Sequence, residues 1–152
     1  MAKILVLYHS QEYGHTKLMA DAVAAGAKAA GADVTAVNTN DARLDVETYR
    51  QMDAAVFGSP DYYSYIAGGL KMFLDDWYIA KNIDGTGLAD KHYGLFYSHG
   101  GGGKVGAVMQ KLFGMLGKQV GQAVESNGKP TEQVLEACKA LGRDVARAAA
   151  RF

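Results

Sequence analysis

The sequence predicts an α/β fold: a three-layer sandwich in which helices cover both faces of a parallel sheet. Short apolar runs, which read as buried strands, alternate with longer segments whose apolar residues recur at helical spacing. Strands that alternate with helices are typical of parallel pairing. Five such runs suit the doubly wound strand order 2-1-3-4-5. The 152 residues suit one domain over the whole chain, residues 1–152, and no linker or internal repeat divides them.

The expected elements follow from these patterns in chain order. We expect strands at 4–8, 33–38, 53–59, 92–98 and 118–124. We expect helices at 17–30, 46–52, 68–77, 104–116 and from 132 onward, with polar connections at 38–44 and 79–91 and a turn at 127–130. Asp45 and Thr131 are suitable N-caps, Gly31 a suitable helix stop, and Pro60 a break after the third strand.

Composition excludes several classes of protein. The 16 Lys and Arg balance the 16 Asp and Glu, so no net field attracts nucleic acid or an anionic membrane surface. Cys138 is the single cysteine, which favours a reducing compartment. No apolar run approaches the roughly 20 residues of a membrane span, and the start has no signal-peptide pattern. We therefore expect a cytoplasmic protein.

The loop at 10–16 joins the first predicted strand to the first predicted helix. Free N–H groups and the positive end of the helix dipole meet there, which favours a phosphate. Ser10 and Thr16 add hydroxyls, and Gly14 permits a close approach of backbone to ligand. Because Lys17 is the only cation at this turn, the pattern favours a phosphate monoester bound mainly by neutral donors. The alternative is an ordinary turn with Thr16 as a hydroxyl cap.

Two more loops, at 60–67 and 99–103, leave the same edge of the predicted sheet. If the loop at 10–16 is the first loop, the loop at 60–67 is the second loop, and it holds three of the nine tyrosines: Tyr62, Tyr63 and Tyr65. The loop at 99–103, the third loop, holds successive glycines whose N–H groups can turn inward. This edge contains the switch point of a doubly wound sheet, where ligands bind. The three loops together therefore predict a pocket for a phosphate joined to a flat ring, unless the tyrosines are only surface cover.

Other motifs are less informative. Residues 101–106 match GxGxxG, but they follow the fourth strand, and adjacent glycines produce such a match easily. We expect His9 and His92 to be structural, and Trp77 and Cys138 to lie in the core. The four histidines lack metal-ligand spacing, and no nucleophile–histidine–acid set is recognisable. We therefore expect no metal and assign no catalytic side chain.

The loops resemble those of a known family. Residues 10–16 are similar to the phosphate loop of the flavodoxin family, which ends in Gly-Asn-Thr or, as in Gly14-His15-Thr16, in Gly-His-Thr. Residues 58–68 and 96–103 resemble flavin loops of its WrbA branch, the NAD(P)H:quinone oxidoreductases. Residues 130–143 are similar to the last helix of short-chain flavodoxins. The likeness covers nearly the whole chain.

The resemblance implies a flavodoxin-like fold with FMN as the cofactor. It places the phosphate on Ser10, Tyr13, Gly14, His15 and Thr16. It places the ring and ribityl chain along Pro60, Asp61, Tyr62, Tyr63, Ser64, Tyr65 and Ile66, and we expect Tyr63 or Tyr65 to stack on the ring. The pyrimidine edge would meet backbone donors of Ser98, His99, Gly100, Gly101, Gly102 and Gly103. The first loop is one residue longer than usual, so the phosphate contacts of Gln11, Glu12 and Tyr13 stay open.

The chain departs from both branches of the family. It lacks the insertions of WrbA-type enzymes and, at 111–117, their paired histidines, whereas electron-carrying flavodoxins are usually acidic and this chain is neutral. We expect an FMN redox protein that passes electrons to partner proteins through its flavin. The alternative is an NAD(P)H-dependent FMN oxidoreductase acting on quinones or nitro compounds. A third hypothesis is a non-catalytic phosphate-ligand sensor or interaction module. The sequence does not decide between a monomer and a homo-oligomer.

Overall fold

A computed structural model describes residues 1–150 of the chain. Within them six strands form one sheet: Lys3–Tyr8 (β1), Asp33–Asn38 (β2), Ala54–Pro60 (β3), Lys91–His99 (β4), Gly117–Gln119 (β5) and Val124–Asn127 (β6). The helices are His15–Ala29 (α1), Val46–Arg50 (α2), Gly68–Ile83 (α3), Val105–Phe113 (α4) and Glu132–Ala149 (α5). None of the helices in this part of the chain is long and apolar enough to cross a bilayer.

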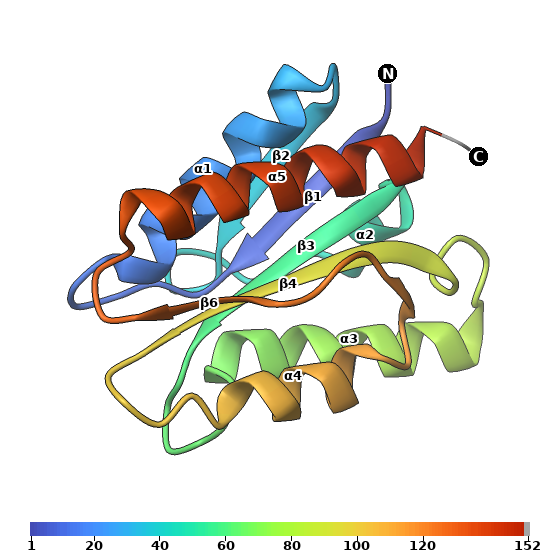
Figure 1. The fold of residues 1–152 in the computed structure, drawn as a ribbon. Helices are drawn as coiled ribbons and strands as arrows, with labels where there is room; N and C mark the ends of the chain where they lie inside the picture. Colours follow the sequence, from blue (N-terminus) through green and yellow to red (C-terminus); the bar gives the residue numbers. More distant parts are fainter. Residues whose placement is uncertain (151–152) are drawn as a thin grey trace.

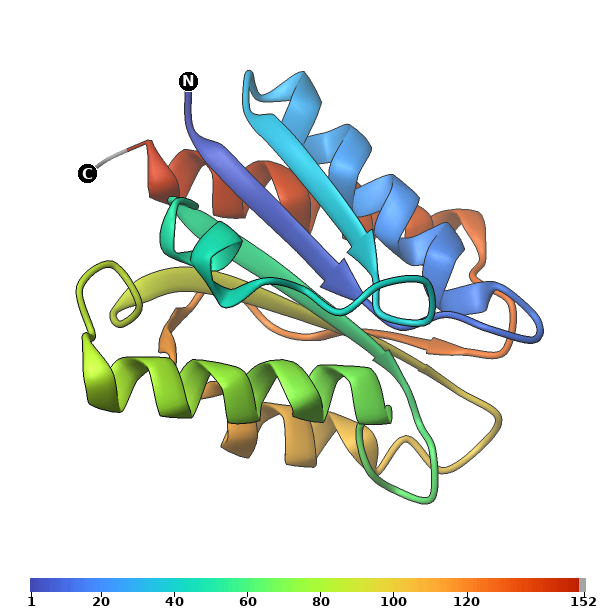
Figure 2. The same cartoon turned by 180° about the vertical axis from the view of Figure 1, so that it is seen from behind.

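The sheet is parallel and has the order β2-β1-β3-β4-β5, with β6 also paired to β4. Helices α1 and α5 cover one face, and α3 and α4 cover the other (Figures 1 and 2). The predicted three-layer fold and strand order are therefore confirmed. Because winding reverses between β1 and β3, the loops that leave their carboxyl ends diverge and create the switch point.

Each face of the sheet has its own apolar core, because successive strand residues point to opposite faces. In β1, Leu5 and Leu7 belong to the core under α3 and α4, whereas Ile4 and Val6 belong to the core under α1 and α5. Two packed layers fix the sheet and hold the carboxyl ends of its central strands in place.

The predicted helix caps are present. The Asp45 side chain accepts a hydrogen bond from Glu47 N at 2.9 Å, and the Thr131 hydroxyl accepts one from Val134 N at 3.2 Å. Gly31 follows α1 with a φ of +90°, a conformation that favours glycine. Local sequence therefore determines where α1 ends and where α2 and α5 begin.

Trp77 and Cys138 are both buried, as predicted. The Trp77 indole donates from Nε1 to the Leu88 carbonyl at 2.8 Å, which ties α3 to the segment before β4. Helix α3 is longer than predicted. It runs on to Ile83, so the connection expected at 79–91 begins only after that residue. Ala80 adds to the buried face of the helix, which explains why Trp77 does not end it.

The predicted fifth strand is interrupted. Instead of one strand at 118–124, β5 pairs with the start of β4 and β6 pairs with its end. Gly121, with a φ of +64°, lies between the two pieces. The expectation of one continuous strand was wrong, because the alternation of Val120 and Val124 does not reveal the bend. The interruption places Glu125 beside the carboxyl end of β4, where the predicted edge loops begin.

Candidate functional site

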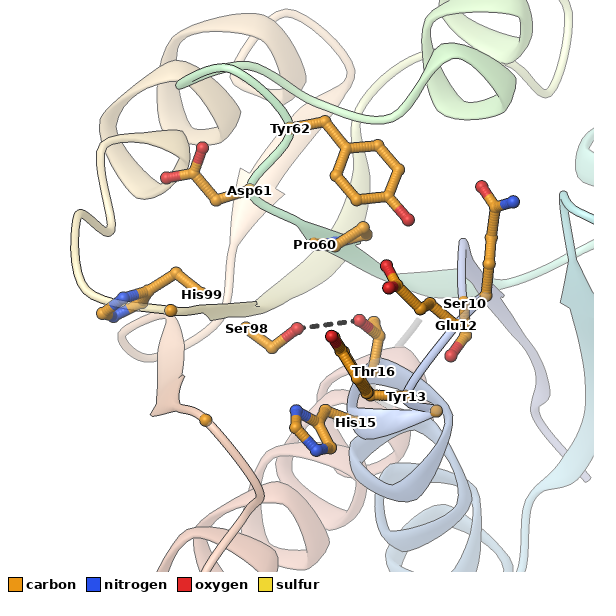
Figure 3. A pocket seen from close by; sticks show the side chains of 14 residues that line it. Ser10, Glu12, Tyr13, His15, Thr16, Pro60, Asp61, Tyr62, Ser98 and His99 are labelled. Carbon is orange, nitrogen blue, oxygen red and sulfur yellow. Dashed lines mark hydrogen bonds between the residues drawn. The ribbon is translucent and has the colours of Figure 1, made fainter.

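A pocket of about 280 Å³ opens at the carboxyl ends of β1, β3 and β4, the predicted edge (Figure 3). All three predicted loops contribute to its wall. The lining residues are Ser10, Gln11, Glu12, Tyr13, Gly14, His15 and Thr16 from the first loop, Pro60, Asp61 and Tyr62 from the second, Ser98, His99 and Gly100 from the third, and Gly128.

Some predicted site residues do not line this pocket: Tyr63, Ser64, Tyr65, Ile66, Gly101, Gly102 and Gly103. The Ile66 side chain is buried in the core under α3 and α4. Tyr63 is fully exposed, and Tyr65 is 40% exposed. The structure therefore brings the phosphate-loop residues together and places only one of the three tyrosines, Tyr62, on the wall.

The first loop is held by Ser10. Its N–H donates to Asn38 Oδ1 and its carbonyl accepts from Asn38 Nδ2, both at 3.0 Å. The Ser10 hydroxyl accepts from Lys17 N at 3.2 Å, which satisfies one of the free N–H groups of α1. Gly14 occupies the N-cap position, and Thr16 lies inside the first turn. Thr16 as a hydroxyl cap, the alternative reading of this turn, is therefore wrong.

Thr16 instead faces β4. Its Oγ1 lies 2.9 Å from Ser98 Oγ, and both residues are buried. Figure 3 shows the two side chains pointing toward one another across the space between α1 and the end of β4. Two hydroxyls carry two protons, and the bond between them uses one. The pair therefore keeps one donor proton for a further acceptor.

The pocket offers neutral donors rather than a cation. The Lys17 ammonium pairs with Asp21 at 3.0 Å, and helical geometry leaves the N–H groups of His15 and Thr16 without an intrahelical acceptor. A Cβ built on Gly14, whose φ is +72°, would meet nothing within 4 Å. Open space beside free N–H groups at a helix N-terminus suits a phosphate.

The second loop, also called the tyrosine loop because it contains Tyr62, Tyr63 and Tyr65, turns sharply at its tip. Tyr62 and Tyr65 exchange backbone hydrogen bonds of 3.1 and 3.0 Å, and the two residues between them have φ of +55° and +62°. Such a turn usually contains Asn and Gly, so Tyr63 and Ser64 adopt a costly conformation. Asp61 stabilises it, since its Oδ1 accepts from Ser64 N at 2.8 Å.

The Tyr62 ring packs against the His9 ring. The two rings meet edge to face, with centroids 5.9 Å apart. His9 is itself fixed, because Nδ1 lies 2.8 Å from Thr39 Oγ1 and Nε2 lies 2.8 Å from Gln11 Oε1. Burial raises the pKa of the Tyr62 phenol, and the charge of Glu12 raises it further. His9 is structural, as predicted, and it joins the first loop to the tyrosine loop.

A sequence model of the flavodoxin family matches residues 6–142. The chain belongs to the flavodoxin family. Among solved structures, a flavodoxin from the domain Archaea superposes with a TM-score of 0.82 at 27% identity, over 97% of this chain and 99% of that one. Membership implies a flavin cofactor.

Curated relatives differ in length from this flavodoxin-family chain. An NAD(P)H dehydrogenase (quinone) of Rhizobium rhizogenes is 30% identical to the chain. The alignment covers 100% of the chain and 99% of that relative. A putative diflavin flavoprotein A 3 of Synechocystis is 29% identical over 147 residues, which are 95% of the chain but 24% of that protein. The chain also spans only 55% of a second NAD(P)H dehydrogenase (quinone), from Sinorhizobium fredii, at 34% identity.

The residues of this flavodoxin-family pocket fit a flavin phosphate. Like Gly14, Gly100 faces open space, because a Cβ on either would meet no atom within 4 Å. Buried hydroxyls lie at the base of the pocket, and the Tyr62 ring lies on its wall. The donor set therefore matches a phosphate and the wall matches an aromatic ring.

Three residues that shape the site were not predicted from the sequence. Asn38 holds Ser10, Gly128 lines the pocket, and Glu125 contacts His99. The position of Asn38 at the end of a predicted strand was a usable signal, since it adjoins the first loop in the order 2-1-3-4-5. Gly128 and Glu125 depend on the position of β6, which was not predicted. Within residues 1–150, no three His, Cys, Asp or Glu side chains gather as metal ligands.

Proposed function

We propose that this flavodoxin-family chain binds FMN in the pocket and serves as an electron carrier. One observation carries the proposal: the buried Thr16–Ser98 hydroxyl pair, the open N-terminus of α1 and the Tyr62 ring meet at one edge of the sheet. A bound flavin supplies the electron-transfer chemistry, and the protein supplies binding and orientation.

The first loop would hold the phosphate. The hydroxyls of Ser10 and Thr16 and the N–H groups at the start of α1 are neutral donors, so the dianion would be held by hydrogen bonds. Hydrogen bonds to charged groups are the stronger class, at about 1.5–3 kcal/mol each. Tyr62 would cover the flavin ring, and backbone donors of the third loop would meet its pyrimidine edge.

Reconstitution with FMN tests this proposal. The purified protein should turn yellow on addition of FMN, retain the flavin through gel filtration, and bind riboflavin more weakly because riboflavin has no phosphate. Photoreduction under anaerobic conditions should then let the flavin pass electrons to an added protein acceptor. A protein that binds inorganic phosphate but neither flavin would instead favour the phosphate-ligand sensor.

A second candidate is an NAD(P)H-dependent FMN oxidoreductase acting on quinones or nitro compounds. It is favoured by the relative from Rhizobium rhizogenes, whose name is NAD(P)H dehydrogenase (quinone) and which aligns over nearly its full length. FMN-loaded protein should be mixed with NADPH or NADH and a benzoquinone, and oxidation followed at 340 nm. Rapid oxidation that requires both FMN and protein would support the enzyme, and its absence would support the carrier.

A further inference from the structure

His99 is held in one protonation state by its two neighbours. The Gly101 N–H donates to Nδ1 at 2.9 Å, and Nε2 lies 2.8 Å from Glu125 Oε2. A backbone N–H can only donate, so Nδ1 must present its lone pair. A carboxylate can only accept, so the ring proton belongs on Nε2. The contacts therefore specify a neutral imidazole with its proton on Nε2.

The third loop folds around this ring. The His99 side chain is only 6% exposed, and Figure 3 shows it beside the bend of the loop, away from the Thr16–Ser98 pair. A Cβ on Gly103, whose φ is +70°, would lie 2.8 Å from Glu125 Oε2 and 3.1 Å from His99 Nε2. The backbone therefore passes directly over the contact between His99 and Glu125, and the ring shapes the loop.

We propose that neutral His99 is a positioning residue of the flavin site: it fixes the peptide groups of Gly100 and Gly101, and protonation at Nδ1 releases them. The proposal rests on the proposed flavin-binding function. A proton on Nδ1 removes the acceptor for Gly101 N–H and places two donors against each other, so the loop must move. His99 and Gly100 line the pocket, so this movement changes the wall that a flavin would meet.

Glu125, from β6, places a carboxylate against the His99 ring. The Tyr97 ring, from β4, stacks on the His99 ring, with the two ring centroids 6.2 Å apart. The Tyr97 phenol stays neutral, because burial and the charge of Glu125 raise its pKa.

Two further ionisable residues, Asp61 and His15, lie on the pocket wall. Asp61, on the second loop, accepts from Val105 N at 3.3 Å. His15 lies on the pocket wall contributed by α1, and Gly128 N donates to the His99 carbonyl at 2.7 Å. Because the FMN phosphate also changes its charge near neutral pH, the effect of His99 must be isolated by substitution and by a ligand without phosphate.

The first test uses NMR on the flavin-free protein. Ring ¹⁵N shifts of His99 should show a protonated Nε2 and an unprotonated Nδ1 at pH 8. As pH falls, the Gly101 amide resonance should move with the same midpoint as the His99 ring. A protonated Nδ1 at pH 8, or a Gly101 amide that ignores the His99 titration, overturns the proposal.

The second test measures riboflavin affinity at pH 8 and pH 5.5. Wild-type affinity should fall roughly threefold to tenfold on acidification, the equivalent of one neutral hydrogen bond. His99→Asn should flatten this profile, because its side-chain oxygen can accept from the N–H two residues on without titrating. His99→Ala, which has no acceptor, should bind more weakly than His99→Asn at both pH values.

Glu125→Gln provides a separate signature. It removes the charge that favours the imidazolium, so the midpoint for both the Gly101 shift and the riboflavin affinity should move to lower pH. A profile that is unchanged in His99→Asn contradicts the proposal. Failure of the wild type to bind any flavin at pH 8 would contradict the proposed function instead, and the NMR titration would still decide the role of His99.

Discussion

Thr16 Oγ1 and Ser98 Oγ lie 2.9 Å apart although 82 positions of sequence separate them. The bond joins the first turn of α1 to the end of β4. It therefore connects the loop assigned to the phosphate with the loop assigned to the pyrimidine edge. Because both hydroxyls are buried, neither can exchange its partner for bulk water without cost.

Thr16→Val should weaken FMN binding by about one to two orders of magnitude. The substitution keeps the side-chain shape and removes a hydrogen bond to a dianion, worth roughly 1.5–3 kcal/mol. Fluorescence titration gives the dissociation constants. Thr16→Ser, which keeps the hydroxyl, is the matched control and should bind nearly as wild type does. Because Thr16→Val also breaks the bond to Ser98, riboflavin affinity can fall as well, but it should fall much less than FMN affinity. An equal loss for both ligands would refute the phosphate assignment.

Tyr62→Ala should loosen oxidised FMN more than reduced FMN. A π-face beside the isoalloxazine disfavours the anionic reduced ring, so its removal should raise the midpoint potential. Each tenfold change in the affinity ratio corresponds to about 30 mV for two electrons.

Redox titrations of Tyr62→Ala, Tyr63→Ala and Tyr65→Ala distinguish the three rings. The sequence favoured Tyr63 or Tyr65 for the stacking contact, whereas Tyr62 lines the pocket. If none of the three variants changes either affinity or potential, the tyrosines are surface cover.

Electron transfer to a native protein partner should depend only weakly on salt. Docking by charge gives rates that fall steeply as salt screens the attraction. This chain has 16 basic and 16 acidic residues and so no net charge for that purpose. Stopped-flow rates between low and physiological ionic strength provide the measurement. A steep fall would show that a local cluster of charge directs docking.

Tyr49→Phe should raise the free energy of unfolding by about 1 kcal/mol. Among residues 1–150, the Tyr49 hydroxyl is buried without a hydrogen-bond partner, and an unsatisfied buried donor is costly. Phe keeps the ring contact with Phe73, whose centroid is 5.2 Å away. Urea unfolding gives the value, and Tyr49→Leu, which loses that ring contact, should be less stable than wild type. A destabilised Tyr49→Phe would reveal a partner for the hydroxyl in solution.

Cys138 should make stability fall with rising pH above about 9. Burial raises the pKa of its thiol from 9.0 to about 12. Between these values the unfolded thiol is ionised and the folded one is protonated, so the folded state binds more protons. The free energy of unfolding then falls by up to about 1.4 kcal/mol per pH unit. Cys138→Ala should lack this contribution, and equal slopes in urea unfolding would contradict the expected pKa.

Features encoded within a few neighbouring residues could be predicted from the sequence. A strand, a glycine, hydroxyls and a helix start occur together between Ile4 and Thr16, so the first loop was recognisable without any distant contact. The alternation of strands and helices predicted a parallel sheet, and the number of apolar runs suited the order 2-1-3-4-5. The caps Asp45 and Thr131 are equally local, because each bonds an N–H two or three residues away.

Features that depend on tertiary contacts could not be predicted. Tyr62 lies on the pocket wall, and the chain turns at the next residue, Tyr63, which has a positive φ. This backbone conformation is unfavourable for tyrosine, so the sequence does not indicate it. The contact of His99 with Glu125 depends on where β6 joins the sheet. That position in turn follows from the bend at Gly121, which the pattern of Val120 did not reveal.

The interruption between β5 and β6 also breaks up one edge of the sheet, the edge opposite β2. A long, straight edge strand presents a row of free N–H and C=O groups that another chain can extend into a larger sheet. Here the outermost strand beyond β4 consists of pieces of three and four residues, separated by a bend. An approaching strand therefore finds no continuous register along residues 117–127. The same bend that brings β6 to the pocket should keep this edge of the sheet from acting as a template for aggregation.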